Sequence, residues 1–95
     1  MQTFKVTQVI DGDTFVVSPE WNWNKQAGDH VRPTGYNAPE LGTPNGTAAA
    51  QRLRQLLLGN QIELKNAVKI DRGRLVCDVF LNSRNLRDYF PAYQT

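Results

Sequence analysis

The sequence predicts an all-β or α+β fold, namely a five-stranded barrel of the OB type with a helix between strands three and four and a short C-terminal helix. Two observations support this: three strand-like segments precede an alanine- and leucine-rich segment, and two further strand-like segments follow it. A length of 95 residues fits one domain with one modest core. We therefore expect a single domain over residues 1–95.

The first three strands are expected at 3–10, 13–18 and 30–36, where β-branched and aromatic residues alternate with polar ones. The polar stretch 19–29 has the composition of a hairpin connection. Pro33 has no backbone N–H to donate, which favours an edge or irregular strand at that point.

A helix is expected between Thr47 as N-cap and Gly59 as C-cap, because alanines and then leucines at helical spacing lie between them. It follows a loop over 37–46 that contains two prolines and two glycines. The remaining expected elements are strands at 61–68 and 74–81 and a terminal helix at 84–90, which Pro91 would stop.

Composition excludes several classes of protein. The formal net charge of +2 permits a nucleic-acid partner without requiring one. No run of 18 apolar residues occurs, so we expect no membrane-spanning helix, and nothing in the chain indicates a compartment. The single cysteine, Cys77, excludes an internal disulfide and a cysteine zinc site, and its apolar neighbours predict a buried thiol.

Residues 9–16 read VIDGDTFV, a run of strand-forming residues that is interrupted by two carboxylates on either side of a glycine. Gly12 at a bulge or bend, with Asp11 capping the turn, would explain part of this pattern. Asp13 and Thr14 are less well explained. Two interpretations therefore stay open at this point: a plain turn, or part of a metal or active site.

Five residues carry groups that phosphodiester hydrolysis requires: Asp13, Arg32, Asn37, Glu40 and Arg74. Carboxylate and amide oxygens are ligands of Ca²⁺, and arginine forks bind phosphoryl oxygens in bidentate fashion. A carboxylate can also take a proton from the attacking water. Spacing alone does not bring these residues together, and an arginine taken singly is more often a solvated surface charge.

The order and separation of four segments resemble those of the staphylococcal nuclease (thermonuclease) family: DGDTF, VRPTGYNAPEL, GTAAAQRLRQLLLGNQIEL and DRGRLVCDVFLNSRNL. The resemblance covers roughly residues 4–88. It implies an OB-type barrel and an enzyme, a Ca²⁺-dependent nuclease that hydrolyses phosphodiester bonds of DNA and RNA, with single-stranded nucleic acid as the expected substrate.

The same resemblance implies a role for each candidate residue. Asp13 and Asn37 fall at the positions of the calcium ligands. Arg32 matches the phosphate-binding arginine, and Glu40 matches the general base. Arg74 matches the second arginine, which binds the substrate and stabilises the transition state.

The sequence departs from the family pattern in three places. Asn37 replaces the usual second carboxylate, so we expect weaker Ca²⁺ binding. The loop before Arg74 is one residue shorter, which leaves this arginine in place only if strand register is kept. Family members usually continue through further helices, whereas this chain ends 14 residues after Leu81. We expect either a trimmed chain or a partner, such as a second copy, that covers the exposed barrel end.

Two rival functions follow from these departures. One is a nucleic-acid-binding OB module that has lost catalysis, which Asn37 and the short loop favour. The other is a protein-interaction domain that uses the barrel as a scaffold. The joint presence of Asp13, Arg32, Glu40 and Arg74 favours the enzyme, because a scaffold needs none of them.

Overall fold

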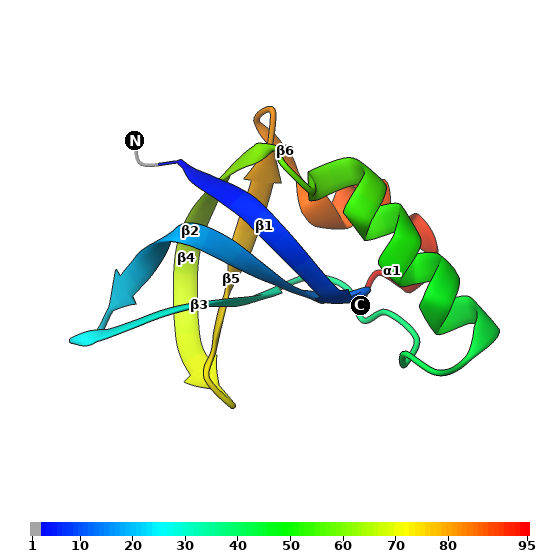
Figure 1. The fold of residues 1–95 in the computed structure, drawn as a ribbon, viewed down its shortest axis with the longest axis horizontal. Coiled ribbons are helices and arrows are strands. Elements are labelled where there is room, and N and C mark those ends of the chain that lie inside the picture. Colours follow the sequence, from blue (N-terminus) through cyan, green and yellow to red (C-terminus); the bar gives the residue numbers. More distant parts are fainter. Residues whose placement is uncertain (1–2) are drawn as a thin grey trace.

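The computed structural model describes residues 3–95, in which five strands close into a barrel and one helix packs against its side (Figure 1). Neighbouring strands pair antiparallel, and a parallel pairing of the third and fifth strands closes the barrel. The predicted OB-type fold, with its helix between strands three and four, is therefore confirmed. The elements are β1 (Phe4–Asp11), β2 (Thr14–Trp23), β3 (Gln26–Pro33), α1 (Pro44–Leu57), β4 (Gln61–Asp71), β5 (Arg74–Leu81) and the two-residue β6 (Arg84–Asn85).

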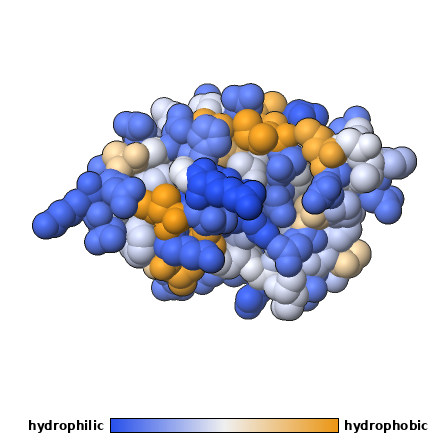
Figure 2. Space-filling view, turned by 90° about the horizontal axis from the view of Figure 1, so that it is seen from below, coloured by the Kyte–Doolittle hydropathy of each residue, from blue (hydrophilic) through white to orange (hydrophobic). Residues whose placement is uncertain are grey.

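The core fills the barrel with alternate residues of each strand, as the pleat of a β-strand requires. In β5 every second side chain is buried, and α1 adds leucines that pack toward β1. Cys77 is fully buried, as predicted, and burial raises the pKa of its thiol to about 12. Figure 2, which looks at the molecule from below, shows a largely hydrophilic face with separate hydrophobic patches.

The long hairpin of β2 and β3 corrects the prediction that 19–29 is a connection. Only Asn24 and Lys25 form the turn, and both have positive φ, 52° and 63°, as a two-residue type I′ hairpin requires. Trp21 is buried, and its indole N–H donates to the His30 carbonyl at 2.8 Å. The third strand accordingly occupies Gln26–Pro33 instead of 30–36.

The helix α1 begins one turn earlier than predicted, because Thr43 and not Thr47 is its N-cap. The Thr43 hydroxyl accepts the Gly46 N–H at 3.0 Å, and Pro44 occupies the first turn, where its missing N–H does no harm. At the other end, Gly59 adopts a φ of +81° just after the helix, as the prediction of a glycine stop implies.

Two further boundaries differ from the prediction. β4 continues past 68 to Asp71, and a two-residue turn then leads into β5. The C-terminal helix expected at 84–90 is replaced by two short 3₁₀ turns, η1 (Leu86–Tyr89) and η2 (Pro91–Tyr93). Within residues 3–95 no helix has the length and apolar character needed to cross a membrane.

Candidate functional site

The turn between β1 and β2 places Asp13 at the edge of the barrel. The Asp11 carboxylate accepts the Asp13 N–H at 3.0 Å, so Asp11 braces the turn as predicted. Gly12 is buried here, and a Cβ atom added to it would lie 2.6 Å from Ala38 Cβ and 2.8 Å from Ala49 Cβ. The turn therefore needs glycine because the following loop and helix pack directly onto its backbone.

Arg32, near the end of β3, connects several parts of the site. Its Nη1 donates to the carbonyls of Pro33 at 2.6 Å and Tyr36 at 3.1 Å. Its Nη2 donates to Asn37 Oδ1 and lies 3.4 Å from Asp13 Oδ2. Three of the five predicted residues, Asp13, Arg32 and Asn37, therefore meet at one guanidinium.

The Asp13 carboxylate is the negative group of this cluster. Burial raises the pKa of Asp13 above its usual range, and the Asp11 carboxyl raises it further, while Arg32 acts in the opposite direction. The Ala38 N–H also donates to Asp13 Oδ2, at 3.3 Å. Because burial disfavours the ionised form of Asp13, a second positive charge nearby would stabilise that form.

The oxygen atoms of Asp13 and Asn37 are of the type that a hard divalent cation takes as ligands. Both contact the same Nη2 atom of Arg32, so they face a common point, which that nitrogen occupies in this structure and would have to leave for a cation. Only one of the two groups is charged. Across residues 3–95 no cluster of three His, Cys, Asp or Glu side chains suited to a metal occurs. Carboxylate and amide oxygens are suitable ligands for Ca²⁺, but only one of these two ligands carries a negative charge.

Arg74 opens β5, and its guanidinium contacts two neighbouring residues. Its Nη1 donates to the hydroxyl of buried Thr14 at 3.1 Å, and its Nη2 pairs with Asp71 at 3.1 Å. The parallel register sets Arg74 opposite His30, so it shares the outer face of the barrel with Arg32. The two-residue turn 72–73 joins β4 to β5 directly before Arg74.

Glu40 is the predicted residue that the structure does not tie to the others. It is exposed in the loop between β3 and α1, and its backbone carbonyl accepts the Thr43 hydroxyl at 2.8 Å. Within residues 3–95 its carboxylate makes no hydrogen bond or ion pair with Asp13 or Arg32.

Tyr36 is a part of the site that sequence reasoning missed. Its side chain is buried, and its hydroxyl donates to the Gly12 carbonyl at 2.9 Å. Burial, with the nearby Asp13 carboxylate, raises the pKa of Tyr36 well above its usual range, so the hydroxyl stays protonated and can donate. In the sequence Tyr36 is the last residue of the strand expected at 30–36, and an aromatic residue there is no specific signal of such a role.

A hollow of about 290 Å³ opens beside the cluster and is lined in part by Arg32, Asn37 and Lys69. It therefore offers two cationic side chains beside the Asn37 amide, and the Asp71 carboxylate also lines it. A larger hollow of about 450 Å³ lies elsewhere, between the end of β2 and β4.

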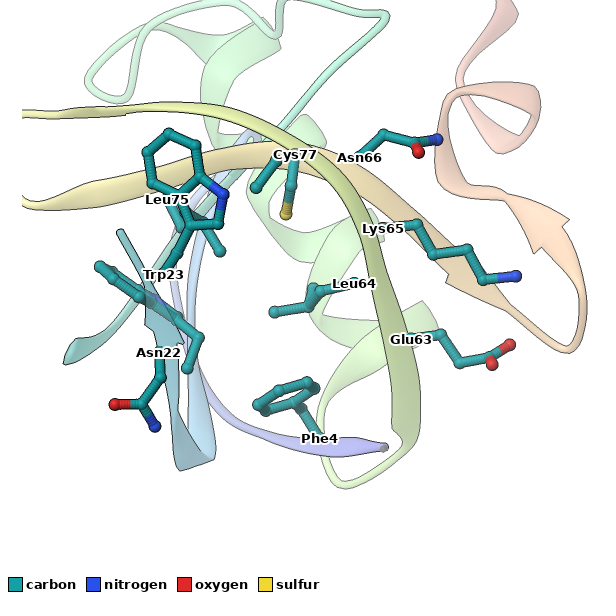
Figure 3. A pocket seen from close by; sticks show the side chains of 11 residues that line it. Phe4, Asn22, Trp23, Glu63, Leu64, Lys65, Asn66, Leu75 and Cys77 are labelled. Carbon is teal, nitrogen blue, oxygen red and sulfur yellow. The ribbon is translucent and has the colours of Figure 1, made fainter. Parts of the chain in front are cut away.

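Figure 3 shows that Phe4, Trp23 and Leu64 point into the larger hollow, whereas Glu63 and Lys65 point away from it. It is therefore mainly apolar, and none of the five predicted residues lines it. An anionic substrate needs cationic groups, so the smaller hollow is the better candidate for its site.

The chain was also compared with known proteins. It matches no model of a known protein family. It also has no significant match among curated proteins.

Proposed function

We propose that this domain is a metal-dependent nuclease of the staphylococcal nuclease type, which hydrolyses phosphodiester bonds of single-stranded DNA or RNA with Ca²⁺ as cofactor. The observation that carries the proposal is the shared contact of Arg32 with Asp13 and Asn37. Arg74 on the same face adds a second guanidinium. Oxygen donors for a cation and two arginines for a phosphate are thus within one small region.

Each residue has a physical role in this proposal. Backbone carbonyls hold Nη1 of Arg32, whereas Nη2 contacts Asn37 and Asp13. A cation held by those two residues would release Nη2 to a phosphoryl oxygen. Asp13 and Asn37 would hold the cation, which when bound supplies positive charge to the phosphoryl group. Glu40 is exposed to solvent and would take the proton of the attacking water.

A second candidate function is nucleic-acid binding without cleavage, and Asn37 favours it. Cation affinity depends on the number of charged ligands, and this site has one carboxylate where a stronger site would have two. The arginines would then bind the phosphate backbone without chemistry, as cationic grooves do in OB-fold proteins.

Digestion of labelled single-stranded DNA and RNA, with Ca²⁺ or with a chelator, tests these functions. Cleavage that requires Ca²⁺ and is lost in Asp13→Asn supports the nuclease. Binding of the oligonucleotide without cleavage supports the binding module. If the protein neither binds nor cleaves the oligonucleotide, both functions are excluded and the protein-interaction scaffold remains. Arg54→Lys, an exposed change on α1, is the matched control.

A further inference from the structure

Tyr36 contacts the candidate cation site from the protein interior. Its side chain is 1% exposed, and its hydroxyl donates to the carbonyl of Gly12, the residue before Asp13. Its own carbonyl accepts Nη1 of Arg32 at 3.1 Å, and the next residue is Asn37. One residue thus connects the turn that carries one proposed ligand to the segment that carries the other.

The Tyr36 ring is fixed from its other side by the C-terminal segment. Its centroid lies 4.9 Å from that of Phe90 with an interplanar angle of 14°, and Tyr93 stacks on Phe90 in turn, at 6.0 Å. The Tyr93 carbonyl accepts the Asn37 N–H at 2.9 Å. The aromatic stack and this backbone bond therefore hold Tyr36 and Asn37 together.

We propose that Tyr36 is a positioning residue, whose hydroxyl bond to Gly12 sets the separation between the Asp13 carboxylate and the Asn37 amide oxygen. The inference rests on the proposed function. A phenol ring is rigid, so its length fixes the distance between the loop and the turn. The other hydrogen bond from this loop to the β1–β2 turn, from the Ala38 N–H to Asp13 Oδ2, is longer, at 3.3 Å.

Preorganisation matters more in this site than in one with two carboxylates. With a single charged ligand, a cation gains less from charge, so affinity depends on holding both oxygens at the correct separation. Groups that orient metal ligands without touching the metal typically change metal affinity by 10- to 100-fold. Loss of the Tyr36 hydroxyl bond is expected to act in this way.

The test is Tyr36→Phe, which removes the hydroxyl and keeps the ring stack. Calorimetric titration with Ca²⁺ is expected to show about tenfold weaker affinity than in the wild type. Nuclease assays should show the same shift in the Ca²⁺ concentration for half-maximal rate, with the rate largely recovered at saturating Ca²⁺. A purely structural role would not shift the Ca²⁺ dependence.

Two control variants separate positioning from stability. Tyr93→Phe removes a hydroxyl that has no hydrogen-bond partner in the described part of the chain, and should leave Ca²⁺ affinity unchanged. Val79→Ala truncates a fully buried residue toward the far end of β5 from Arg74. It should lower the melting temperature without changing Ca²⁺ affinity.

Each outcome decides the inference. Equal Ca²⁺ affinity in the wild type and Tyr36→Phe overturns it and leaves the proposed function standing. A wild type that binds no Ca²⁺ overturns the proposed cofactor, and the inference with it. If Tyr36→Phe does not fold, Phe90→Leu replaces it, because it loosens the stack and keeps the hydroxyl. Weaker Ca²⁺ binding supports the inference, and unchanged binding overturns it.

Discussion

The guanidinium of Arg74 donates a hydrogen bond to the hydroxyl of Thr14 at 3.1 Å. Thr14 is 3% exposed and directly follows Asp13 in the chain. A solvated surface arginine would have no such partner. The contact therefore anchors Arg74 next to the candidate cation site, and Asp71 holds its other terminal nitrogen at 3.1 Å.

Lysine cannot replace either arginine, because an ammonium group lacks the planar fork that contacts two partners at once. We expect Arg32→Lys and Arg74→Lys each to lower the nuclease rate by about 10²–10³-fold, as loss of one preorganised donor does in other enzymes. The melting temperature should also fall, because lysine loses part of the hydrogen bonds of Arg32 and Arg74, so rates are compared well below that temperature. Rates at saturating Ca²⁺ test this, with Arg54→Lys as the control. Full activity in Arg74→Lys alone would restrict Arg74 to a structural role.

The barrel was predictable from sequence because its strands have a clear period of two and a helix-forming segment separates them at the right place. The extent of the β2–β3 hairpin was not. The parts of β2 and β3 nearest the turn carry mainly polar residues. The turn itself consists of Asn24 and Lys25, and lysine is not a typical residue at positive φ. Composition alone therefore suggested a long loop, while cross-strand pairing and the burial of Trp21 extend both strands.

A second carboxylate at position 37 should strengthen the cation site. Asn37 already presents an oxygen beside that of Asp13, and aspartate would keep the shape of the side chain while adding a negative charge. Residue 37 is exposed, but a charge in direct contact with a divalent cation is still worth more than about 1.4 kcal/mol, or about tenfold in affinity. We expect Asn37→Asp to tighten Ca²⁺ binding by at least that factor in a calorimetric titration. Equal or weaker binding would place residue 37 outside the metal shell.

Glu40 requires a different measurement, because it is assigned a role in proton transfer and not in binding. Glu40→Gln keeps the size of the side chain and the backbone bond to Thr43, so folding should be unaffected. Removal of a general base typically lowers the rate by about 10²–10⁴-fold. We expect that loss in single-turnover cleavage at saturating Ca²⁺, with oligonucleotide affinity unchanged. A rate close to that of the wild type would mean that another group accepts the proton.

The roles of the candidate residues stay predictions, and the contacts that position these residues could not be predicted from the sequence. Gly12 was read as a bend, whereas its missing side chain allows Ala38 and Ala49 to approach the turn. This close approach joins segments far apart in the sequence, and no local pattern encodes it. The same holds for Tyr36, whose partner Gly12 lies 24 residues away.

Asp78 should make the stability of the barrel dependent on pH in acid. The Thr34 hydroxyl and the Asn66 amide both donate to its carboxylate, and these bonds lower the pKa of Asp78 below its usual value near 4. The folded state therefore favours the ionised form. Its contribution is complete above the unfolded pKa and disappears as pH falls through the lower folded pKa.

The variant Asp78→Asn tests this dependence. At pH 7 we expect a loss of about 1 kcal/mol or less in the free energy of unfolding, since Asp78 is partly exposed and solvent screens its charge. Urea unfolding at a series of pH values should show the difference from the wild type narrowing below about pH 4. A difference that stays constant down to pH 2.5 would mean that the charge of Asp78 is not involved.

Gly46 should respond to substitution with the opposite sign from most glycines in helices. Alanine in place of a helical glycine usually stabilises by about 0.5–1 kcal/mol. Here a Cβ atom on Gly46 would lie 1.7 Å from the Glu40 carbonyl oxygen, which is backbone and cannot rotate away. The loop that carries Glu40 must therefore move, and we expect Gly46→Ala to lower the free energy of unfolding by about 1–3 kcal/mol.

The displacement should also affect catalysis, because the same loop carries both Asn37 and Glu40. Thr47→Ala, one residue later on the exposed side of α1, is the matched control and should leave both stability and cleavage nearly unchanged. Urea unfolding and cleavage rates of the two variants check this. If Gly46→Ala is as stable as the wild type, the loop does not pack on the start of α1 in solution. If it is less stable but cleaves at the wild-type rate, the position of Glu40 does not limit the reaction.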